Sequence, residues 1–185
     1  MSYKEILEKI KPELDKAVDF LKRELAKVRT SRPSPAIVED IMIDCFGQKF
    51  PLKQLATISI EKGRQILIQP WDKSYIESIV RTLEKVKRGF NISVQNNTIR
   101  ISLPPLTQEY REELIKLVSQ KKEDATKTIR RWRDEAWSKI QRLQREGIIS
   151  EDEKFKAKKE LQKIIDEYNE EIKNLVEKKK KEIME

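Results

Sequence analysis

Apolar residues recur every three or four positions along both ends of the chain. One series runs from Ile6 to Val28, and two further series follow Thr107 and Ser150. This spacing places the apolar side chains on one stripe of an α-helix. The pattern predicts three long amphipathic helices. Because proline lacks the N–H that a helix interior uses, we expect a kink or a frayed first segment at Pro12.

The two C-terminal helices carry local start and stop signals. Thr107 is a predicted N-cap, and Gly147 stands where a helix commonly ends with a positive φ. Ser150 with Glu153 three positions later forms the pattern of a capping box. At 1.5 Å per residue the two helices would be roughly 60 Å and 50 Å long. Short loops between such helices predict an elongated antiparallel three-helix bundle.

A different pattern interrupts the helical one between residues 31 and 104. Runs rich in β-branched residues, bounded by glycine and proline, predict strands at Val38–Cys45, Thr57–Ile60, Arg64–Gln69, Ile92–Gln95 and Thr98–Leu103, with Gly47, Gly63 and Pro70 as boundaries. Ser74 with Glu77 predicts a capped helix that ends before Gly89. Asn96-Asn97 predicts a tight hairpin turn, since asparagine tolerates positive φ.

The two patterns together predict an α+β protein with two domains. An elongated antiparallel three-helix bundle, residues 1–30 and 105–185, carries an inserted small β/α/β domain, residues 31–104. Residues 30–105 hold 11 basic and 7 acidic side chains, whereas the other 109 residues hold 29 and 25. About half of the outer part is therefore charged, which is typical of long solvated helices. Both connections contain proline, and two adjacent crossings predict a hinge.

Composition excludes several classes of function. The chain has no histidine, which excludes Ser-His-Asp catalysis and imidazole metal sites. Its single cysteine, Cys45, excludes an internal disulfide and a multi-cysteine metal site; we interpret it as a small buried apolar residue rather than a reactive thiol. There is no glycine-rich phosphate loop and no apolar run of membrane-spanning length. We expect a cytoplasmic protein that is not an enzyme and has no cofactor.

The net charge of +8 is distributed unevenly. Residues 119–145 contain nine basic and four acidic side chains, and arginine predominates. Arginine binds phosphate oxygens through a planar fork, so this stretch favours nucleic-acid binding. The alternative is a solvated helix face, with pairs at i,i+4 between Arg130 and Asp134 and between Arg131 and Glu135. The pattern alone leaves both interpretations open.

Three tryptophans complete the candidate features. Trp132 lies on the apolar stripe of the basic helix, which predicts core packing. Trp137, five positions later, points in another direction and is equally compatible with a core or an exposed position. Trp71 precedes the inserted helix and is predicted to be structural.

Several strings, taken in order, resemble the bacterial ribosome recycling factor family. They are VRTSRPSP at 28–35, FG at 46–47, PLKQLA at 51–56, LPPLT at 103–107 followed by Arg111, and IRRWRDEA at 129–136. The resemblance covers essentially the whole chain. It departs from the usual family pattern at Ser31, Pro33 and Tyr110, where glycine, alanine and arginine are usual.

The resemblance implies an L-shaped molecule that binds the large ribosomal subunit across its A and P sites. With elongation factor G, and with GTP hydrolysed by that partner, such a factor separates the subunits after termination. The implied rRNA contacts are Arg130 and Arg133, with Arg29 and Arg111 as contributors; Arg131 and Lys127 of the basic stretch are further candidates. The expected hinge comprises Thr30, Ser31, Arg32, Pro33, Pro104 and Pro105.

Two alternatives stay open beside this reading, in which the protein is a monomer. A structural or interaction protein would use the apolar seam to form an intermolecular coiled coil, and it would be a stable dimer. A general RNA-binding module would bind bulk RNA as well as it binds ribosomal subunits.

Overall fold

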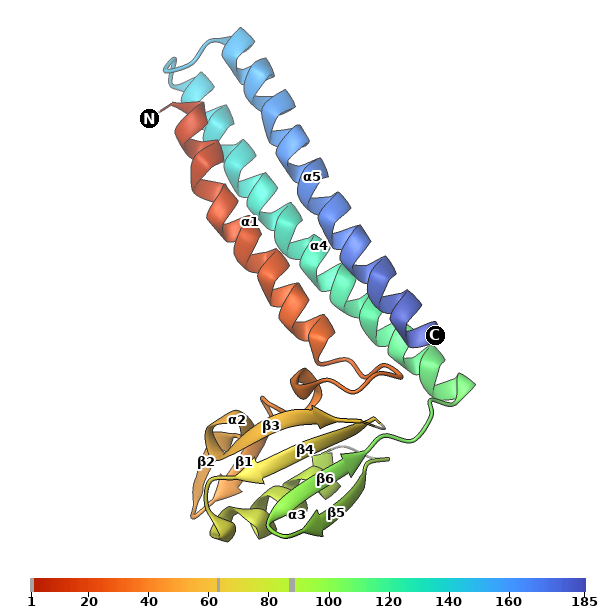
Figure 1. Cartoon of the computed structure of the whole chain (residues 1–185). Helices are drawn as coiled ribbons and strands as arrows, with labels where there is room; N and C mark the ends of the chain where they lie inside the picture. Colours follow the sequence, from red (N-terminus) through yellow and green to blue (C-terminus); the bar gives the residue numbers. More distant parts are fainter. Residues whose placement is uncertain (1, 63, 87–88) are drawn as a thin grey trace. The chain divides into compact units, whose positions relative to one another are not determined.

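The computed structural model describes residues 2–62, 64–86 and 89–185 (Figure 1). The chain divides into two compact units. The helical unit comprises Met1–Leu25 and Ile115–Lys181, and the sheet unit comprises Ala26–Leu114 and Glu182–Glu185. The ends of the long helices therefore group with the sheet. A functional boundary at residues 30 and 105 stays a prediction.

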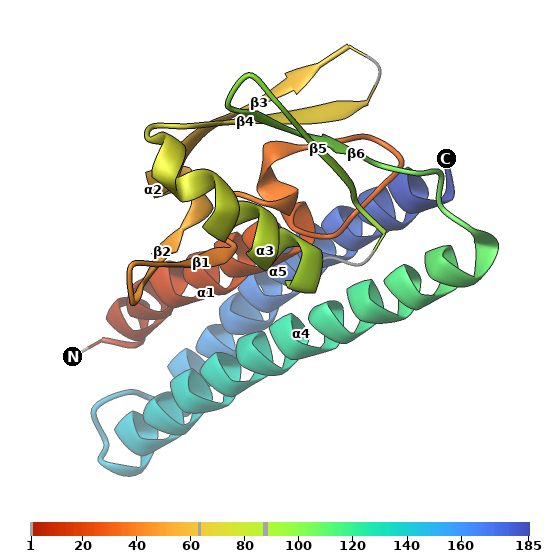
Figure 2. The same cartoon turned by 90° about the horizontal axis from the view of Figure 1, so that it is seen from below.

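The greater part of each of three long helices lies in the helical unit: α1 (Tyr3–Ala26), α4 (Gln108–Arg145) and α5 (Glu151–Met184). They run side by side, and Figure 2 shows the same arrangement from a second direction. The predicted stripes form the seam between them, with fully buried side chains at Leu14, Leu21, Val118, Ile129, Ile140, Ile172 and Val176. The three-helix bundle predicted from apolar spacing is confirmed.

Helix α1 runs through Pro12 without a break, so the predicted frayed first segment is wrong, while a kink at Pro12 stays a prediction. Pro12 lies on the exposed side of the helix. The carbonyl that loses its intrahelical partner there is that of Glu8, which is also exposed and can bind water instead. The buried face on either side, Leu7 and Leu14, continues undisturbed.

The predicted helix ends are confirmed. The backbone N–H of Tyr110 donates to Thr107 Oγ1 at 3.2 Å. Gly147 has a φ of 71°, which a residue with a Cβ rarely adopts, and the chain turns there into α5. Ser150 and Glu153 form the reciprocal capping box, with N···O distances of 2.8 and 3.2 Å.

The sheet unit contains a four-stranded antiparallel sheet and a separate hairpin. The sheet has the order β3-β4-β6-β5, and the hairpin pairs β1 with β2. The strands are β1 (Met42–Cys45), β2 (Gln48–Pro51), β3 (Ala56–Glu61), β4 (Gln65–Pro70), β5 (Asn91–Gln95) and β6 (Thr98–Ser102). The helices are α2 (Leu52–Leu55), α3 (Ile76–Val86), and the 3-10 turns η1 (Pro35–Ile37) and η2 (Lys73–Tyr75).

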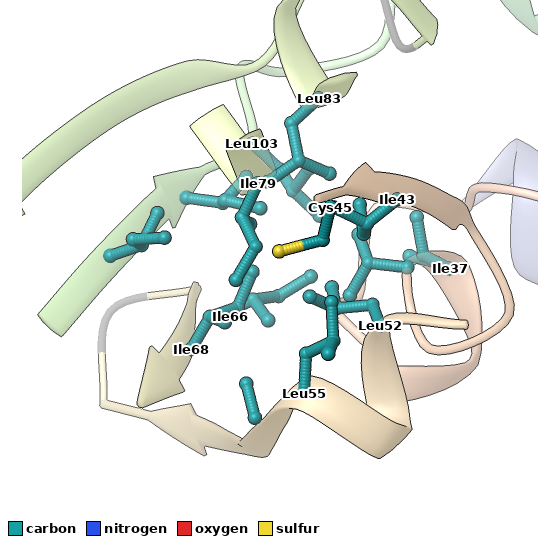
Figure 3. Packing of buried hydrophobic residues seen from close by; sticks show 14 residues of the cluster. Ile37, Ile43, Cys45, Leu52, Leu55, Ile66, Ile68, Ile79, Leu83 and Leu103 are labelled. Carbon is teal, nitrogen blue, oxygen red and sulfur yellow. The ribbon is translucent and has the colours of Figure 1, made fainter. Parts of the chain in front are cut away.

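An apolar cluster of buried residues holds the sheet unit together. Alternate residues of β4 and β6 face it, and Ile66 pairs with Ile101 while Ile68 pairs with Ile99. Helix α3 belongs to the same cluster through Ile79 and Leu83. Figure 3 shows the sulfur of Cys45 pointing among these side chains. Cys45 is 1% exposed, so its interpretation as a buried apolar residue is confirmed.

The local details of the sheet unit differ from the sequence expectation in three places. The strand predicted from Val38 begins only at Met42, because the turn at η1 and the residues after it occupy the preceding segment. β2 and α2 were not predicted, since QKFPLKQL has neither strand alternation nor the length of a helix. Gly63, a predicted strand boundary, lies outside the described residues.

The capping box predicted at Ser74 and Glu77 is wrong. Asp72 caps this segment instead: its Oδ1 accepts a hydrogen bond from the N–H of Ser74 at 2.8 Å. This bond lowers the pKa of the Asp72 carboxyl. Glu77 accepts from Arg81 one turn later, at 2.6 Å. Asp72, two residues before Ser74, is therefore the N-cap of this segment.

Candidate nucleic-acid interface

Helix α4 places two of the predicted RNA-contacting arginines on one side. Arg130 and Arg133 are three residues apart and Trp137 follows four residues later, a spacing that aligns side chains along a helix. Lys158 of α5 has its Nζ 5.8 Å from the centre of the Trp137 ring. We call Arg130, Arg133 and Trp137 the arginine edge. It lies beside α5.

Arg130 carries the most available charge of this edge. Its side chain is exposed and has no hydrogen bond or ion pair within the described part of the chain. Arg133 is 37% exposed, and its Nε and Nη2 donate to Asp134 Oδ1 at 2.9 and 2.7 Å. An anion can therefore bind Arg130 directly, whereas at Arg133 it must compete with a carboxylate.

The two ion pairs expected on a solvated face are absent from the described residues, so that expectation is wrong. Asp134 accepts from Arg133 rather than from Arg130. Glu135 accepts from Lys139, with an N···O distance of 2.7 Å. Asp134 therefore neutralises Arg133, and Glu135 neutralises Lys139. The charge of Arg130 is not offset by an ion pair among the described residues.

Lys127 and Arg131 are placed differently from the arginine edge. Lys127 lies one turn before Arg130, and its Nζ is 3.2 Å from Glu123 Oε1. Arg131 turns toward α1, where its guanidinium carbon is 5.4 Å from the centre of the Trp132 ring. Both Arg131 and Trp132 line a groove of about 450 Å³ between α1 and α4, together with Phe20. Trp132 is only half-buried, so it is not sealed in the core.

Arg29 and Arg111 belong to the sheet unit. Arg29 is 8% exposed, its Nη2 donates to the carbonyl of Pro104, and its guanidinium carbon lies 5.7 Å from the Tyr110 ring centre. Burial lowers the pKa of Arg29, and Tyr110 partly opposes that shift. Arg111 is half-buried and donates to the carbonyl of Met184 at 3.3 Å. A role in RNA binding for these two stays a prediction.

The six predicted hinge residues lie in the segments that join α1 to η1 and β6 to α4. Thr30 is 7% exposed, and its Oγ1 accepts a hydrogen bond from the N–H of Arg32 at 3.2 Å. The bond from Arg29 to Pro104 ties one segment to the other. The hinge itself stays a prediction, but its two segments are linked by a buried arginine.

Residues 2–62, 64–86 and 89–185 contain neither a cluster of metal-binding side chains nor a membrane-spanning helix. Within these ranges no three acidic or cysteine side chains gather as metal ligands would. None of the helices described has the length and apolarity to cross a bilayer.

Sequence reasoning placed one aromatic residue wrongly and overlooked another. Trp71, predicted to be structural, is 68% exposed, and Phe46 is 78% exposed. A signal for Phe46 was present: Phe46-Gly47 has the length of a hairpin turn, but phenylalanine is unusual there.

Comparison with known proteins identifies the relatives of this chain. Residues 21–184 match the model of the family described as "Ribosome recycling factor". The chain is 44% identical to the ribosome-recycling factor of Aquifex aeolicus over 180 residues, 97% of this chain and 96% of that one. It is likewise 44% identical to the Hydrogenobaculum factor over 181 residues, 98% of this chain and 97% of the other.

Solved structures agree with the sequence relatives. A solution structure of a ribosome recycling factor matches 100% of this chain and 98% of its own, with a TM-score of 0.75 and 43% identity. The T. thermophilus factor matches with a TM-score of 0.68 and 34% identity, over 100% of both chains. It belongs to models in which that factor and E. coli elongation factor G are bound to the E. coli post-termination complex.

Proposed function

Because this chain belongs to the ribosome recycling factor family, we propose that it disassembles post-termination ribosomes into subunits. Its partners are the large ribosomal subunit with its rRNA, and elongation factor G, which binds and hydrolyses GTP. The chain acts in the cytoplasm as a monomer and contributes binding surfaces rather than catalytic groups. The bound state of the T. thermophilus relative, beside elongation factor G on a post-termination complex, supports this choice of partners.

One observation carries the proposal: Arg130 is exposed and unpaired among the described residues, next to Arg133 on the same side of α4. A guanidinium without a protein partner loses no ion pair when it binds a phosphate oxygen. Charge-assisted hydrogen bonds of this kind contribute about 1.5–3 kcal/mol each. Trp137, beside them, offers a ring on which a base can stack.

The helices can transmit force once they are anchored. α4 has 38 residues and α5 has 34, and both run without a break. Uninterrupted, packed helices resist bending, so a push on one part of the protein would reach the anchored arginines. Elongation factor G supplies the push in this proposal. The connecting segments, tied by Arg29, supply the joint.

The arginine edge is tested by measuring affinity for the large subunit at fixed salt. We expect Arg130→Ala to weaken binding by about 1–3 kcal/mol, with a smaller loss for Arg133→Ala, because Arg133 must first leave Asp134. Arg23→Ala is the matched control, since it removes one exposed arginine from α1 in the same unit. An Arg130→Ala protein that folds and binds like the wild type removes this residue from the interface.

The function as a whole is tested by subunit splitting. Post-termination ribosomes, elongation factor G and GTP are mixed with the protein, and free subunits are measured by light scattering. Failure to split ribosomes of the same species contradicts the proposal. A stable dimer would favour the structural coiled coil, and equal affinity for bulk RNA and subunits would favour the general RNA-binding module.

A further inference from the structure

The turn between β1 and β2 contains a residue type that its backbone conformation disfavours. Phe46 and Gly47 form a two-residue loop in which both φ angles are positive, 54° and 75°. The turn between β5 and β6 has the same geometry at Asn96 and Asn97, with φ angles of 48° and 66°. Asparagine tolerates this conformation, whereas most other residues with a Cβ are strained in it. Phenylalanine at the first turn position therefore costs stability that asparagine would not.

Exposure of the Phe46 ring adds to this cost. The ring is 78% exposed and makes one edge-to-face contact, with Tyr75 at 6.2 Å between ring centres. Burial of a phenylalanine side chain stabilises a folded protein, and most of that stabilisation is absent at this exposed position. Neither the turn nor the core gains from this residue. Such conflicts between local preference and sequence are expected at functional positions.

Phe46 borders a hollow of about 490 Å³ in the sheet unit. Its floor is buried and apolar, at Cys45 and Leu55. The whole lining consists of uncharged residues: Cys45, Phe46, Gln48, Phe50, Gln54, Leu55 and Tyr75. We call this the Phe46 pocket. The charged hairpin residues Asp44 and Lys49 pair with each other in the register, one position away from Cys45 and Gln48, and so lie on the opposite face.

An uncharged lining is informative in a chain that is 39% charged. RNA binding requires cations against the phosphates, and the pocket offers none. A charged occupant would lose its hydration without gaining a partner. Protein interfaces, in contrast, have centres rich in aromatic residues and poor in charge. The exposed amides of Gln48 and Gln54 can bond a partner's backbone at the rim.

We propose that the Phe46 pocket receives an uncharged apolar side chain of a protein partner, held by Phe46, Phe50 and Tyr75. This inference rests on the proposed function, in which that partner is elongation factor G. The two surfaces then divide the work: the arginine edge binds RNA, and the Phe46 pocket binds the protein that drives the reaction.

The Phe46→Asn substitution removes the phenyl ring but keeps the turn conformation. Asparagine suits the positive φ, so the variant should fold at least as stably as the wild type while lacking the phenyl group. Trp71→Ala is the control, because it removes an aromatic side chain that is 68% exposed in the same unit but outside the pocket. We expect Phe46→Asn to lower the affinity for elongation factor G on post-termination ribosomes roughly tenfold or more, and Trp71→Ala to leave it unchanged.

Photo-crosslinking identifies the occupant. With p-benzoylphenylalanine in place of Gln48, at the rim, we expect a covalent adduct to elongation factor G on ribosomes stalled with a non-hydrolysable GTP analogue. An adduct to rRNA or to a ribosomal protein overturns the inference. So does a Phe46→Asn protein that binds elongation factor G and splits ribosomes like the wild type.

Affinity for the large subunit keeps the two proposals apart. If the wild type binds subunits and splits ribosomes but Phe46→Asn does so equally, only the pocket assignment is wrong. If the wild type itself neither binds nor splits ribosomes, the proposed function fails and the inference that rests on it fails too.

Discussion

The helical unit and the sheet unit acquire their surfaces in different ways. On α4 the arginine edge follows from the spacing of residues along one helix, and its chemistry is charge. In the sheet unit the Phe46 pocket combines residues from a hairpin, a four-residue helix and a 3-10 turn, and all of its lining residues are uncharged. A charged surface can thus be recognised from a local run of sequence, whereas a neutral pocket becomes visible only when distant segments meet.

The buried apolar residues that stabilise each unit are also arranged differently. The seam of the helical unit is spread along three helices, while the sheet unit depends on one cluster in which Ile66, Ile68, Ile99 and Ile101 are fully buried. A lost contact in an extended seam leaves neighbouring turns intact. The same loss in one small cluster affects every strand that packs against it.

The largest expected effect therefore comes from the sheet core. Ile101→Ala should destabilise the sheet unit by about 2–5 kcal/mol, the range for truncating a buried isoleucine. Ile60→Ala, at an isoleucine of β3 that is 43% exposed, should change stability by no more than about 0.5 kcal/mol. Hydrogen exchange should show lost protection in β4 and β6 but not in α5. Equal loss in α5 would mean that the units unfold together.

Salt dependence gives a sharper comparison of the two surfaces. Affinity of the wild type for the large subunit should fall linearly with the logarithm of salt concentration, as counterion release requires. Arg130→Ala should reduce this slope by about 1, the contribution of one phosphate contact. Phe46→Asn should leave the slope unchanged, because the pocket carries no charge. Filter binding between 50 and 200 mM salt measures all three; equal slopes for the wild type and Arg130→Ala would contradict the assignment of the arginine edge.

The smallest effect concerns a local signal in the helical unit. The N–H of Ser150 donates to Glu153 and lowers the pKa of that carboxyl below its usual value. The resulting stabilisation is present above the unfolded pKa, about 4.3, and is lost as pH falls through the lower folded pKa. Glu153→Gln keeps a capping amide but does not titrate. Its melting temperature should fall less than that of the wild type between pH 5 and pH 3, and parallel curves would exclude this contribution.

Much of the three long helices was predictable because their determinants are local. The stripes of α1, α4 and α5, the N-cap at Thr107 and the capping box at Ser150 each depend on residues within a few positions of one another. The hairpin turn at Asn96-Asn97 was predictable for the same reason. The capping box predicted at Ser74 failed because the N–H of Ser74 donates a hydrogen bond to Asp72.

The candidate site was predictable only in part. Arg130 and Arg133 were named from the sequence, but their pairing was not: Asp134 bonds its neighbour Arg133 instead of Arg130. Burial of Arg29 against Pro104 and Tyr110 depends on two segments 75 residues apart. No local pattern indicates such a contact.

By itself, the sequence determined the three long helices, the inserted strands other than β2, the positive charge on α4 and the family. Periodicity, capping and composition act over a few residues, so they can be interpreted without a fold. Only the tertiary structure decided which arginine is unpaired, that Trp71 and Phe46 face solvent, and that an uncharged pocket forms beside Tyr75. These properties depend on which distant side chains compete for the same space, and that competition is settled by packing.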